Sequence, residues 1–136
     1  MLTYGDGVSD VDISALVDHH TKHGKIATLT AVQLPAKFGV LDIDAENMIL
    51  DFKEKLESDA GWNNGGFMVL EYEVFRYTNN NPMQIFEREP LENLVKDRQL
   101  SALRHRGFWL PMDTLRDKNK LESLWGSGQA PWKIWK

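Results

Sequence analysis

The stretch Thr3-Tyr4-Gly5-Asp6-Gly7 decides how this chain folds, and Trp109-Leu110-Pro111-Met112-Asp113-Thr114 is its counterpart near the other end. Each stretch places one aspartate where an extended segment passes into a turn. Two carboxylates that come from different elements can hold one divalent cation, which is a common way to build a phosphate-handling metal site. We therefore expect the two ends of the chain to fold together around Asp6 and Asp113.

Composition indicates one ordinary globular domain, which we assign to residues 1–136. Hydrophobic residues make up 42% and charged residues 26%, and the net charge is -4, which argues against a nucleic-acid partner. The absence of cysteine excludes thiol catalysis, disulfides and cysteine-ligated zinc. No apolar run approaches the ~20 residues of a membrane span, and no secretory signal is visible, so the cytoplasm is the expected location.

The first third of the chain predicts a strand, a helix and a second strand. Residues 1–4 resemble the end of a buried strand, and glycines on both sides of Asp6 predict a tight turn. Ser9 is expected to cap a helix that ends at Gly24. Residues 26–34 are rich in Thr, Val, Ala and Leu, as strands are. This βαβ-like order predicts parallel pairing between residues 1–4 and 26–34.

Further strands and helices are expected in the remainder of the chain. They are a hairpin of residues 38–43 and 48–52, a strand at 67–70, a helix from Glu71 to before Asn79, a helix opening at Glu89-Pro90, a strand at 100–105, and a helix capped by Thr114 with Asp117 that stops at Gly126. We expect the aromatic residues near the C-terminus to lie in the core or in a subunit contact. They are Phe108, Trp109, Trp125, Trp132 and Trp135.

The chain begins inside its first extended run, at Met1, without a preceding loop or cap. That run has at most four residues before Gly5, fewer than the ~5 to 6 of an ordinary strand. A whole α/β nucleotide-handling fold also carries a glycine-rich phosphate loop after its first strand. Gly5-Asp6-Gly7 is too short for that loop, and Asn64-Gly65-Gly66 leads into a strand instead of a helix. We therefore expect that an N-terminal half of the fold is missing.

Five segments in order give the chain a family resemblance. They are Leu2-Thr3-Tyr4-Gly5-Asp6-Gly7-Val8, Phe38-Gly39-Val40-Leu41-Asp42-Ile43, Phe52-Lys53-Glu54-Lys55, Gly61-Trp62-Asn63-Asn64-Gly65-Gly66-Phe67, and Gly107-Phe108-Trp109-Leu110-Pro111-Met112-Asp113-Thr114-Leu115-Arg116-Asp117. The chain resembles the second half of the glucose-1-phosphate cytidylyltransferases, which are sugar-nucleotide pyrophosphorylases. This implies an α/β fold: a three-layer, Rossmann-like (GT-A-like) nucleotidyltransferase with a mixed sheet, lacking its N-terminal half.

The resemblance also implies a reaction, in which CTP and α-D-glucose 1-phosphate give CDP-glucose and pyrophosphate. Asp6 and Asp113 match its metal ligands, and Mg²⁺ is the implied cofactor. Lys55 would meet the sugar phosphate, and Glu54 would accept hydrogen bonds from sugar hydroxyls. The other implied substrate contacts are Gly5, Gly39, Asn64 and Gly65. The family is oligomeric, supplies precursors of bacterial surface polysaccharide, and implies a homo-oligomer here.

Each of these residues has a simpler structural interpretation. Asp6 suits a turn, and Asp113 suits a helix cap. The Glu54-Lys55 pair could be a solvated strand end, and Asn64-Gly65-Gly66 could be plain turn chemistry. The chain departs from the family at Leu56, Asn63, Arg106 and Leu110. The departures at Leu56 and Arg106 bear on the placement of Lys55 and on the surroundings of Asp113.

Three histidines on the first predicted helix, His19, His20 and His23, favour a polar helix face over a metal site, and His105 receives no role. Three functions stay open. The first is the metal- and sugar-binding half of a cytidylyltransferase, which we expect to be inactive alone because it lacks a phosphate loop. The second is a non-catalytic binding or assembly module. The third is a pyrophosphorylase that uses another nucleoside triphosphate.

Overall fold

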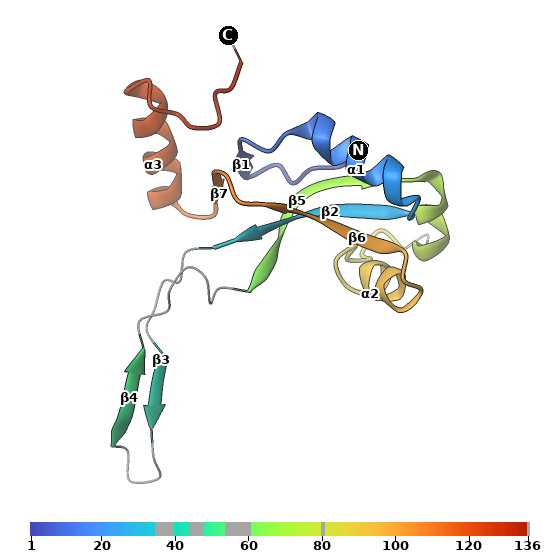
Figure 1. Cartoon of the computed structure of the whole chain (residues 1–136), viewed down its shortest axis with the longest axis horizontal. Helices are drawn as coiled ribbons and strands as arrows, with labels where there is room; N and C mark the ends of the chain where they lie inside the picture. Colours follow the sequence, from blue (N-terminus) through green and yellow to red (C-terminus); the bar gives the residue numbers. More distant parts are fainter. Residues whose placement is uncertain (35–39, 44–47, 54–60, 80, 136) are drawn as a thin grey trace.

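A mixed three-stranded sheet in the order β5-β2-β6 occupies the centre of the computed structural model (Figure 1). The structure describes residues 1–34, 40–43, 48–53, 61–79 and 81–135. The central strand β2 (Ala27–Gln33) pairs antiparallel with β5 (Trp62–Leu70) and parallel with β6 (Leu100–His105). The predicted mixed sheet is therefore confirmed.

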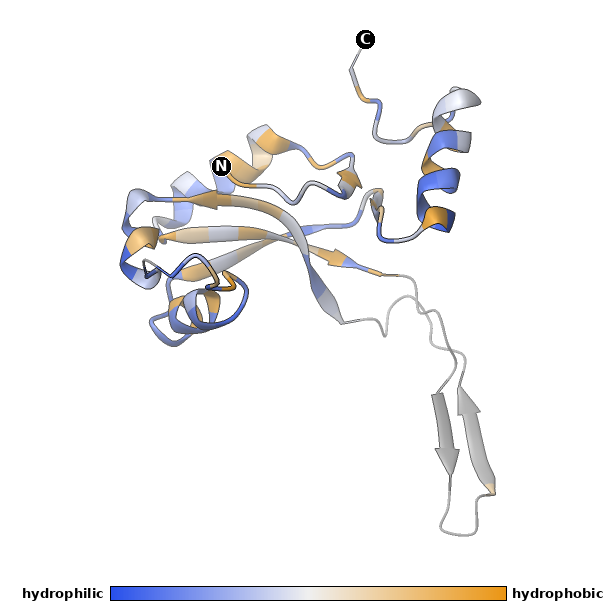
Figure 2. Cartoon of the chain, turned by 180° about the vertical axis from the view of Figure 1, so that it is seen from behind, coloured by the Kyte–Doolittle hydropathy of each residue, from blue (hydrophilic) through white to orange (hydrophobic). Residues whose placement is uncertain are grey.

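Helices cover both faces of this sheet and give three layers (Figure 1). On one face lies α1 (Ile13–His23), and on the other lie the 3-10 helix η2 (Tyr72–Tyr77) and α2 (Glu89–Lys96). Successive residues of a strand point to opposite faces. Ala27 accordingly packs in a buried cluster with Val74, Leu91 and Leu94, whereas Thr28 contacts histidines of α1. Figure 2 shows apolar residues concentrated along the central strands.

The start of α1 differs from the prediction, although its end does not. Asp12, and not Ser9, caps the helix, because the Asp12 carboxylate accepts a hydrogen bond from the backbone N–H of Ala15 at 2.9 Å. Ser9 lies in a strand instead, and its hydroxyl donates to the carbonyl of Phe108 at 2.7 Å. Gly24 ends the helix in the left-handed conformation, with φ 62, as predicted.

The predicted parallel pairing of residues 1–4 with β2 is wrong. Leu2 forms an antiparallel bridge with Met68 on β5, and the N–H of Tyr4 donates to the carbonyl of Gly66. Strand β5 therefore lies between residues 1–4 and β2. The strand that pairs in parallel with β2 is β6, which lies far along the chain. Local order along the chain could not distinguish these partners.

Strand β5 begins at Trp62 and so includes Asn64-Gly65-Gly66, which were expected before the strand. The pairing with β2 is irregular between Leu29 and Ala31, at the level of these glycines. Gly66 has φ +81, and a Cβ there would lie 2.6 Å from the ring of Tyr4. The glycines thus allow residues 1–4 to lie close against the edge of β5.

The hairpin and the helices that begin near Pro90 and Thr114 agree with the predictions, whereas the helix predicted from Glu71 does not. Strands β3 (Val40–Ile43) and β4 (Ile49–Lys53) form the expected antiparallel hairpin. Helix α2 begins with Pro90 in its first turn, and α3 (Leu115–Gly126) has the Thr114–Asp117 capping box. The helix predicted from Glu71 is the short η2 instead. No helix among the described residues is long and apolar enough to cross a membrane.

The tryptophans of the C-terminal tail pack against α3 and against Phe108. Trp132 lies 5.3 Å from Phe108 and 6.5 Å from Trp125, measured between ring centroids. Trp125 and Trp135 remain 52% and 56% exposed, so these two rings are not part of the core. Their predicted alternative role, in a subunit contact, stays a prediction.

The histidines of α1 face the sheet, so the predicted polar helix face is wrong. His20 is 3% exposed, and its ring nitrogens lie 2.8 Å from Thr28 Oγ1 and 3.0 Å from Glu71 Oε1. His19 contacts Ser101, and His23 contacts Thr28. Hydroxyls on β2 and β6 satisfy these rings, which is why they can be covered. Among the described residues, no group of three or more metal-ligating side chains could hold a metal ion.

We expect this histidine cluster to make the fold sensitive to acid. Burial lowers the pKa of His23, and the nearby His19, His20 and Lys25 lower it further. The carboxyl group of Glu71 lies 3.0 Å from His20 in the same cluster. A histidine with a lowered folded pKa binds its proton more readily when unfolded. Stability should therefore be full above pH ~6.5 and decline as the pH falls below it.

The measurement is urea unfolding between pH 5 and pH 8. The loss from His23 should stay well below the limit of about 1.4 kcal/mol per pH unit that one proton allows, because the ring is partly solvated. His23→Gln should flatten this decline, and Lys22→Gln, on the same helix turn, should leave it unchanged. An identical pH profile for His23→Gln and the parent chain would contradict the expectation.

Gly65 gives a second test of the fold. A Cβ at Gly65 would lie 2.8 Å from Val32 Cγ1 and 3.0 Å from the carbonyl oxygen of Thr30. Because the second neighbour is backbone, Gly65→Ala should destabilise the chain by about 1–3 kcal/mol in urea unfolding. Gly61→Ala is the matched control, because nothing lies within 4 Å of its added Cβ. Equal stability of the two variants would contradict this close approach.

Candidate functional site

Three segments that run in the same direction end at one edge of the sheet. Strands β2 and β6 are parallel, and residues 1–4 run the same way because they and β2 are both antiparallel to β5. Their carboxyl ends lead to Gln33, His105 and Asp6. Open α/β sheets bind ligands beyond the carboxyl ends of parallel strands. A ligand site is therefore expected at this edge.

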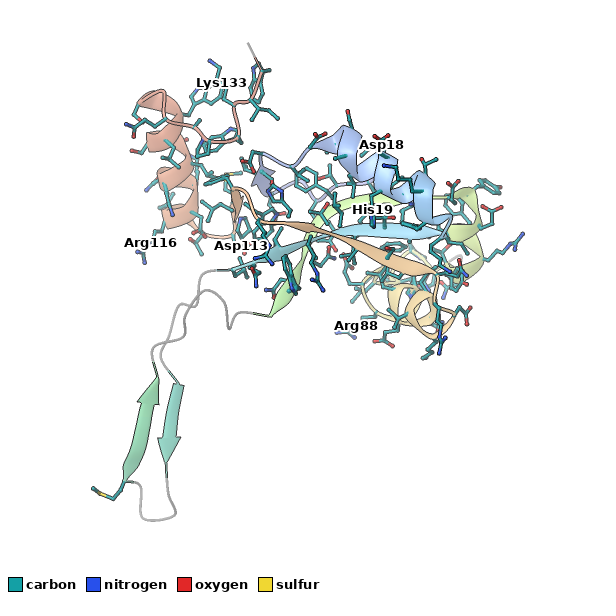
Figure 3. The ribbon with its side chains drawn as sticks, in the orientation of Figure 1. Asp18, His19, Arg88, Asp113, Arg116 and Lys133 are labelled. Carbon is teal, nitrogen blue, oxygen red and sulfur yellow. The ribbon has the colours of Figure 1, made fainter. Side chains whose placement is uncertain are left out.

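Asp6 and Asp113 are brought to this edge by a short antiparallel ribbon. Strand β1 (Gly7–Ser9) pairs with β7 (Trp109–Pro111), with Gly7 opposite Pro111. The N–H of Met112 then donates to the carbonyl of Asp6 at 2.8 Å, so the ladder continues to the residue before Asp113. The structure thus confirms that the two ends of the chain meet. Figure 3 labels Asp113 where β7 leads toward α3.

Both carboxylates are available for a ligand. Asp6 and Asp113 are exposed, and within the described part of the chain neither side chain has a hydrogen bond or an ion pair. Thr114 caps α3 through its own hydroxyl, so the structure does not use Asp113 as the cap. Mg²⁺ is commonly held by one or two carboxylates, with water and substrate phosphates completing its shell. The two exposed carboxylates lie on adjoining backbone segments, and their ligation of Mg²⁺ stays a prediction.

The indole of Trp109 ties the ribbon to the sheet. Its Nε1–H donates to the carbonyl of Gly65 at 2.9 Å, and a Cβ on Gly7 would lie 3.6 Å from the same nitrogen. One contact therefore joins the segment before Asp113, the segment after Asp6 and the glycines of β5. Neither Gly5 nor Gly7 has a positive φ, so the chain bends around Asp6 without the glycine-only backbone angles that were expected there. Gly7 instead gives room for close packing.

Asn64 and Tyr4 form a second link between these segments. The Asn64 amide donates to the Tyr4 hydroxyl at 2.8 Å and accepts from the N–H of Gly66 at 3.0 Å. The Tyr4 hydroxyl donates in turn to Glu87. Burial, followed by the hydrogen bond to Glu87, raises the pKa of Tyr4 and keeps the phenol protonated. Both polar groups of Asn64 thus make contacts inside the chain, and its predicted sugar contact stays a prediction.

A set of contacts around His105, which the sequence analysis did not predict, joins the two strands at the end of the ribbon away from Asp6 and Asp113. His105 Nε2 lies 2.9 Å from Asp10 Oδ1, 3.3 Å from Ser9 Oγ and 3.2 Å from the carbonyl of Phe108. Because serine and aspartate meet the same ring nitrogen, this is not a proton-relay triad. A Cβ on Gly107 would lie 2.5 Å from Asp10 Oδ1. In the sequence, these contacts could have been suspected because Gly107, which leaves room for Asp10, stands two residues after His105.

The remaining predicted residues divide into two groups. Gly65 lies within the site, and Gly5 is exposed with nothing within 4 Å of an added Cβ. Gly39, Glu54 and Lys55 lie outside the described residues. A separate cavity of about 390 Å³ opens between η2 and α2, lined by residues such as Arg76 and Asn93, and neither aspartate lines it.

Comparisons with known proteins agree with this architecture. The chain is 50% identical over 135 residues to a glucose-1-phosphate cytidylyltransferase of Salmonella typhi, covering 99% of this chain and 52% of that protein. It is 32% identical to a mannose-1-phosphate guanyltransferase of Saccharomyces cerevisiae, over 82% of this chain and 32% of that protein. The chain thus spans about half the length of the cytidylyltransferase that it matches.

A solved structure supports the fold. The structure of a protein provisionally named glucose-1-phosphate thymidylyltransferase, from Bacillus anthracis, superposes with a TM-score of 0.58 at 18% identity, over 97% of this chain and 53% of that chain. Residues 1–117 match the protein family described as "Nucleotidyl transferase". From this match and from the identity of its relatives, we conclude that the chain belongs to the nucleotidyl transferase family.

Proposed function

We propose that this chain is the sugar-phosphate- and metal-binding half of a glucose-1-phosphate cytidylyltransferase. In the complete enzyme, CTP and α-D-glucose 1-phosphate would give CDP-glucose and pyrophosphate. The observation that carries the proposal is the β1–β7 ribbon, which sets Asp6 beside the segment that bears Asp113. The 50% identity to a cytidylyltransferase supports the choice of reaction.

Asp6 and Asp113 would hold Mg²⁺, which would neutralise charge on the phosphates when it is bound. A phosphate oxygen of the sugar phosphate attacks the α-phosphorus of CTP, a new P–O bond forms, and the bond to the departing pyrophosphate breaks. The protein's part is positioning and electrostatic stabilisation. Lys55 would meet the sugar phosphate as a point charge. Glu54, Gly39, Asn64, Gly65 and Gly5 would line the sugar side of the site.

The choice of CTP rests on sequence identity to relatives more than on the chemistry of residues in this chain. A cytidylyltransferase matches at 50% identity, whereas a guanyltransferase matches at 32% over a shorter part of the chain. This difference favours CTP. The described residues contain no group that points to a particular base, so the use of another nucleoside triphosphate is the alternative that a nucleotide panel would test.

A second candidate function is a non-catalytic binding or assembly module that forms a homo-oligomer. It is favoured by one observation: the sequence shows no glycine-rich phosphate loop. Such a module would keep the metal and sugar-phosphate contacts without turnover. Its oligomeric state can be measured by sedimentation.

The metal proposal predicts a specific loss of cation binding. Titration of the chain with Mn²⁺, a spectroscopic substitute for Mg²⁺, should show one site in the presence of glucose 1-phosphate. Asp6→Asn or Asp113→Asn should weaken this site at least ~tenfold, because each removes one of two carboxylate ligands. Asp18→Asn, an exposed change on α1, is the control and should bind like the parent chain. Undiminished binding in the Asp6→Asn, Asp113→Asn double variant would reject the site.

Catalysis gives an independent prediction. The chain alone, mixed with CTP, glucose 1-phosphate and Mg²⁺, should release pyrophosphate no faster than its Asp113→Asn variant does. The physical reason is that its sequence shows no glycine-rich loop to bind the triphosphate. Rapid pyrophosphate release that disappears in Asp113→Asn would show that the chain is a complete catalyst and would overturn the half-enzyme proposal.

A further inference from the structure

Two arginines converge on one tryptophan at the ligand-binding edge of the sheet. The guanidinium carbons of Arg104 and Arg106 lie 5.4 Å and 5.3 Å from the ring centroid of Trp62. These distances are within cation–π range. Both arginines are exposed, and within the described part of the chain neither guanidinium has a carboxylate partner. We call Trp62, Arg104 and Arg106 the arginine platform.

The platform lies at the same end of the sheet as the two aspartates. Arg104 is opposite Ala31 near the carboxyl end of β2, and Trp62 is opposite Gln33 at that end. Arg106 follows β6 directly and precedes Trp109, whose strand β7 leads to Asp113. The platform thus occupies the edge where the parallel strands end, which is the edge at which open α/β sheets bind ligands.

Packing alone does not explain this arrangement well. A single arginine on the indole would cover one face of the ring, whereas two cations close to one ring repel each other. An anion between or beside the two guanidiniums would relieve that repulsion. The guanidinium group presents paired N–H donors that match phosphate oxygens, and stacking on an aromatic ring fixes its orientation.

We propose that the arginine platform is a binding subsite for a phosphoryl anion. The subsite would act beside the metal site, because Asp6 and Asp113 attract a cation and the two arginines attract the phosphate that accompanies it. The assignment of this phosphate to a substrate or product rests on the proposed function. Three ligands carry such a phosphoryl group, namely the sugar phosphate, the triphosphate and pyrophosphate. Separate titrations distinguish them.

The experiment is calorimetric titration of the chain with glucose 1-phosphate, CTP and inorganic pyrophosphate, each in excess EDTA. We expect at least one of these anions to bind, and its affinity to fall at least ~fivefold in Arg104→Gln and in Arg106→Gln, because each removes a charged hydrogen-bond donor. The double variant should lose measurable binding. Arg116→Gln, an exposed arginine of α3 labelled in Figure 3, is the matched control and should change nothing. The ligand with the largest loss identifies the source.

Two further variants separate anion binding by the arginines from a purely structural role. The double variant Arg104→Lys, Arg106→Lys keeps both positive charges but removes the planar guanidinium groups. Its anion affinity should lie between those of the parent chain and the double glutamine variant, while its melting temperature stays that of the parent chain. The Asp6→Asn, Asp113→Asn double variant should retain the EDTA-resistant anion binding. That result would support the platform even if the metal proposal failed.

The opposite results overturn the proposal. Absence of anion binding to the parent chain, or equal binding in the parent chain and the glutamine double variant, would show that the arginines only cover Trp62. Loss of stability in the lysine variant without a change in anion affinity would also show that the arginines are structural. A chain that binds Mn²⁺ through its aspartates but fails these tests would keep the proposed function and lose this subsite.

Discussion

The hydrogen bond from the Trp109 indole to the carbonyl of Gly65 is the contact on which the rest of the site depends. A two-stranded ribbon of three residue pairs, such as β1–β7, is marginal by itself. Trp109 attaches it to the central sheet, and the His105–Asp10 contact closes its other end. With both anchors in place, the backbone beside Asp6 and Asp113 has one register.

Small residues make that anchoring possible. Gly65 touches Val32 and the backbone of Thr30, and Gly107 lies against Asp10, so the ribbon and the sheet approach more closely than side chains would allow. Gly66 adopts a positive φ where β5 pairs irregularly, which lets Tyr4 lie over it. The glycines that resemble a sugar-pocket motif in the sequence therefore have a structural role.

Charge is distributed unevenly at the edge of the sheet where the parallel strands end. Two exposed carboxylates come from the ribbon, and two guanidiniums without carboxylate partners among the described residues come from the end of β6. A metal ion together with a phosphorylated sugar is a pair of opposite charges, and an edge of this kind would complement both. The histidine cluster under α1 is separate in character, because hydroxyls of the sheet and Glu71 satisfy its rings.

The sequence by itself determined what depends on neighbouring residues. The Thr114–Asp117 capping box, the Gly24 end of α1, Pro90 at the start of α2 and the strand character of residues 27–33 follow from local hydrogen bonds and propensities, and the ordered motifs identified the family. Only the tertiary structure decided that residues 1–4 pair with β5, that the histidines face inward and that two arginines share Trp62. These arrangements join residues far apart in the chain, and their free energies depend on strand register and side-chain packing that no local pattern specifies.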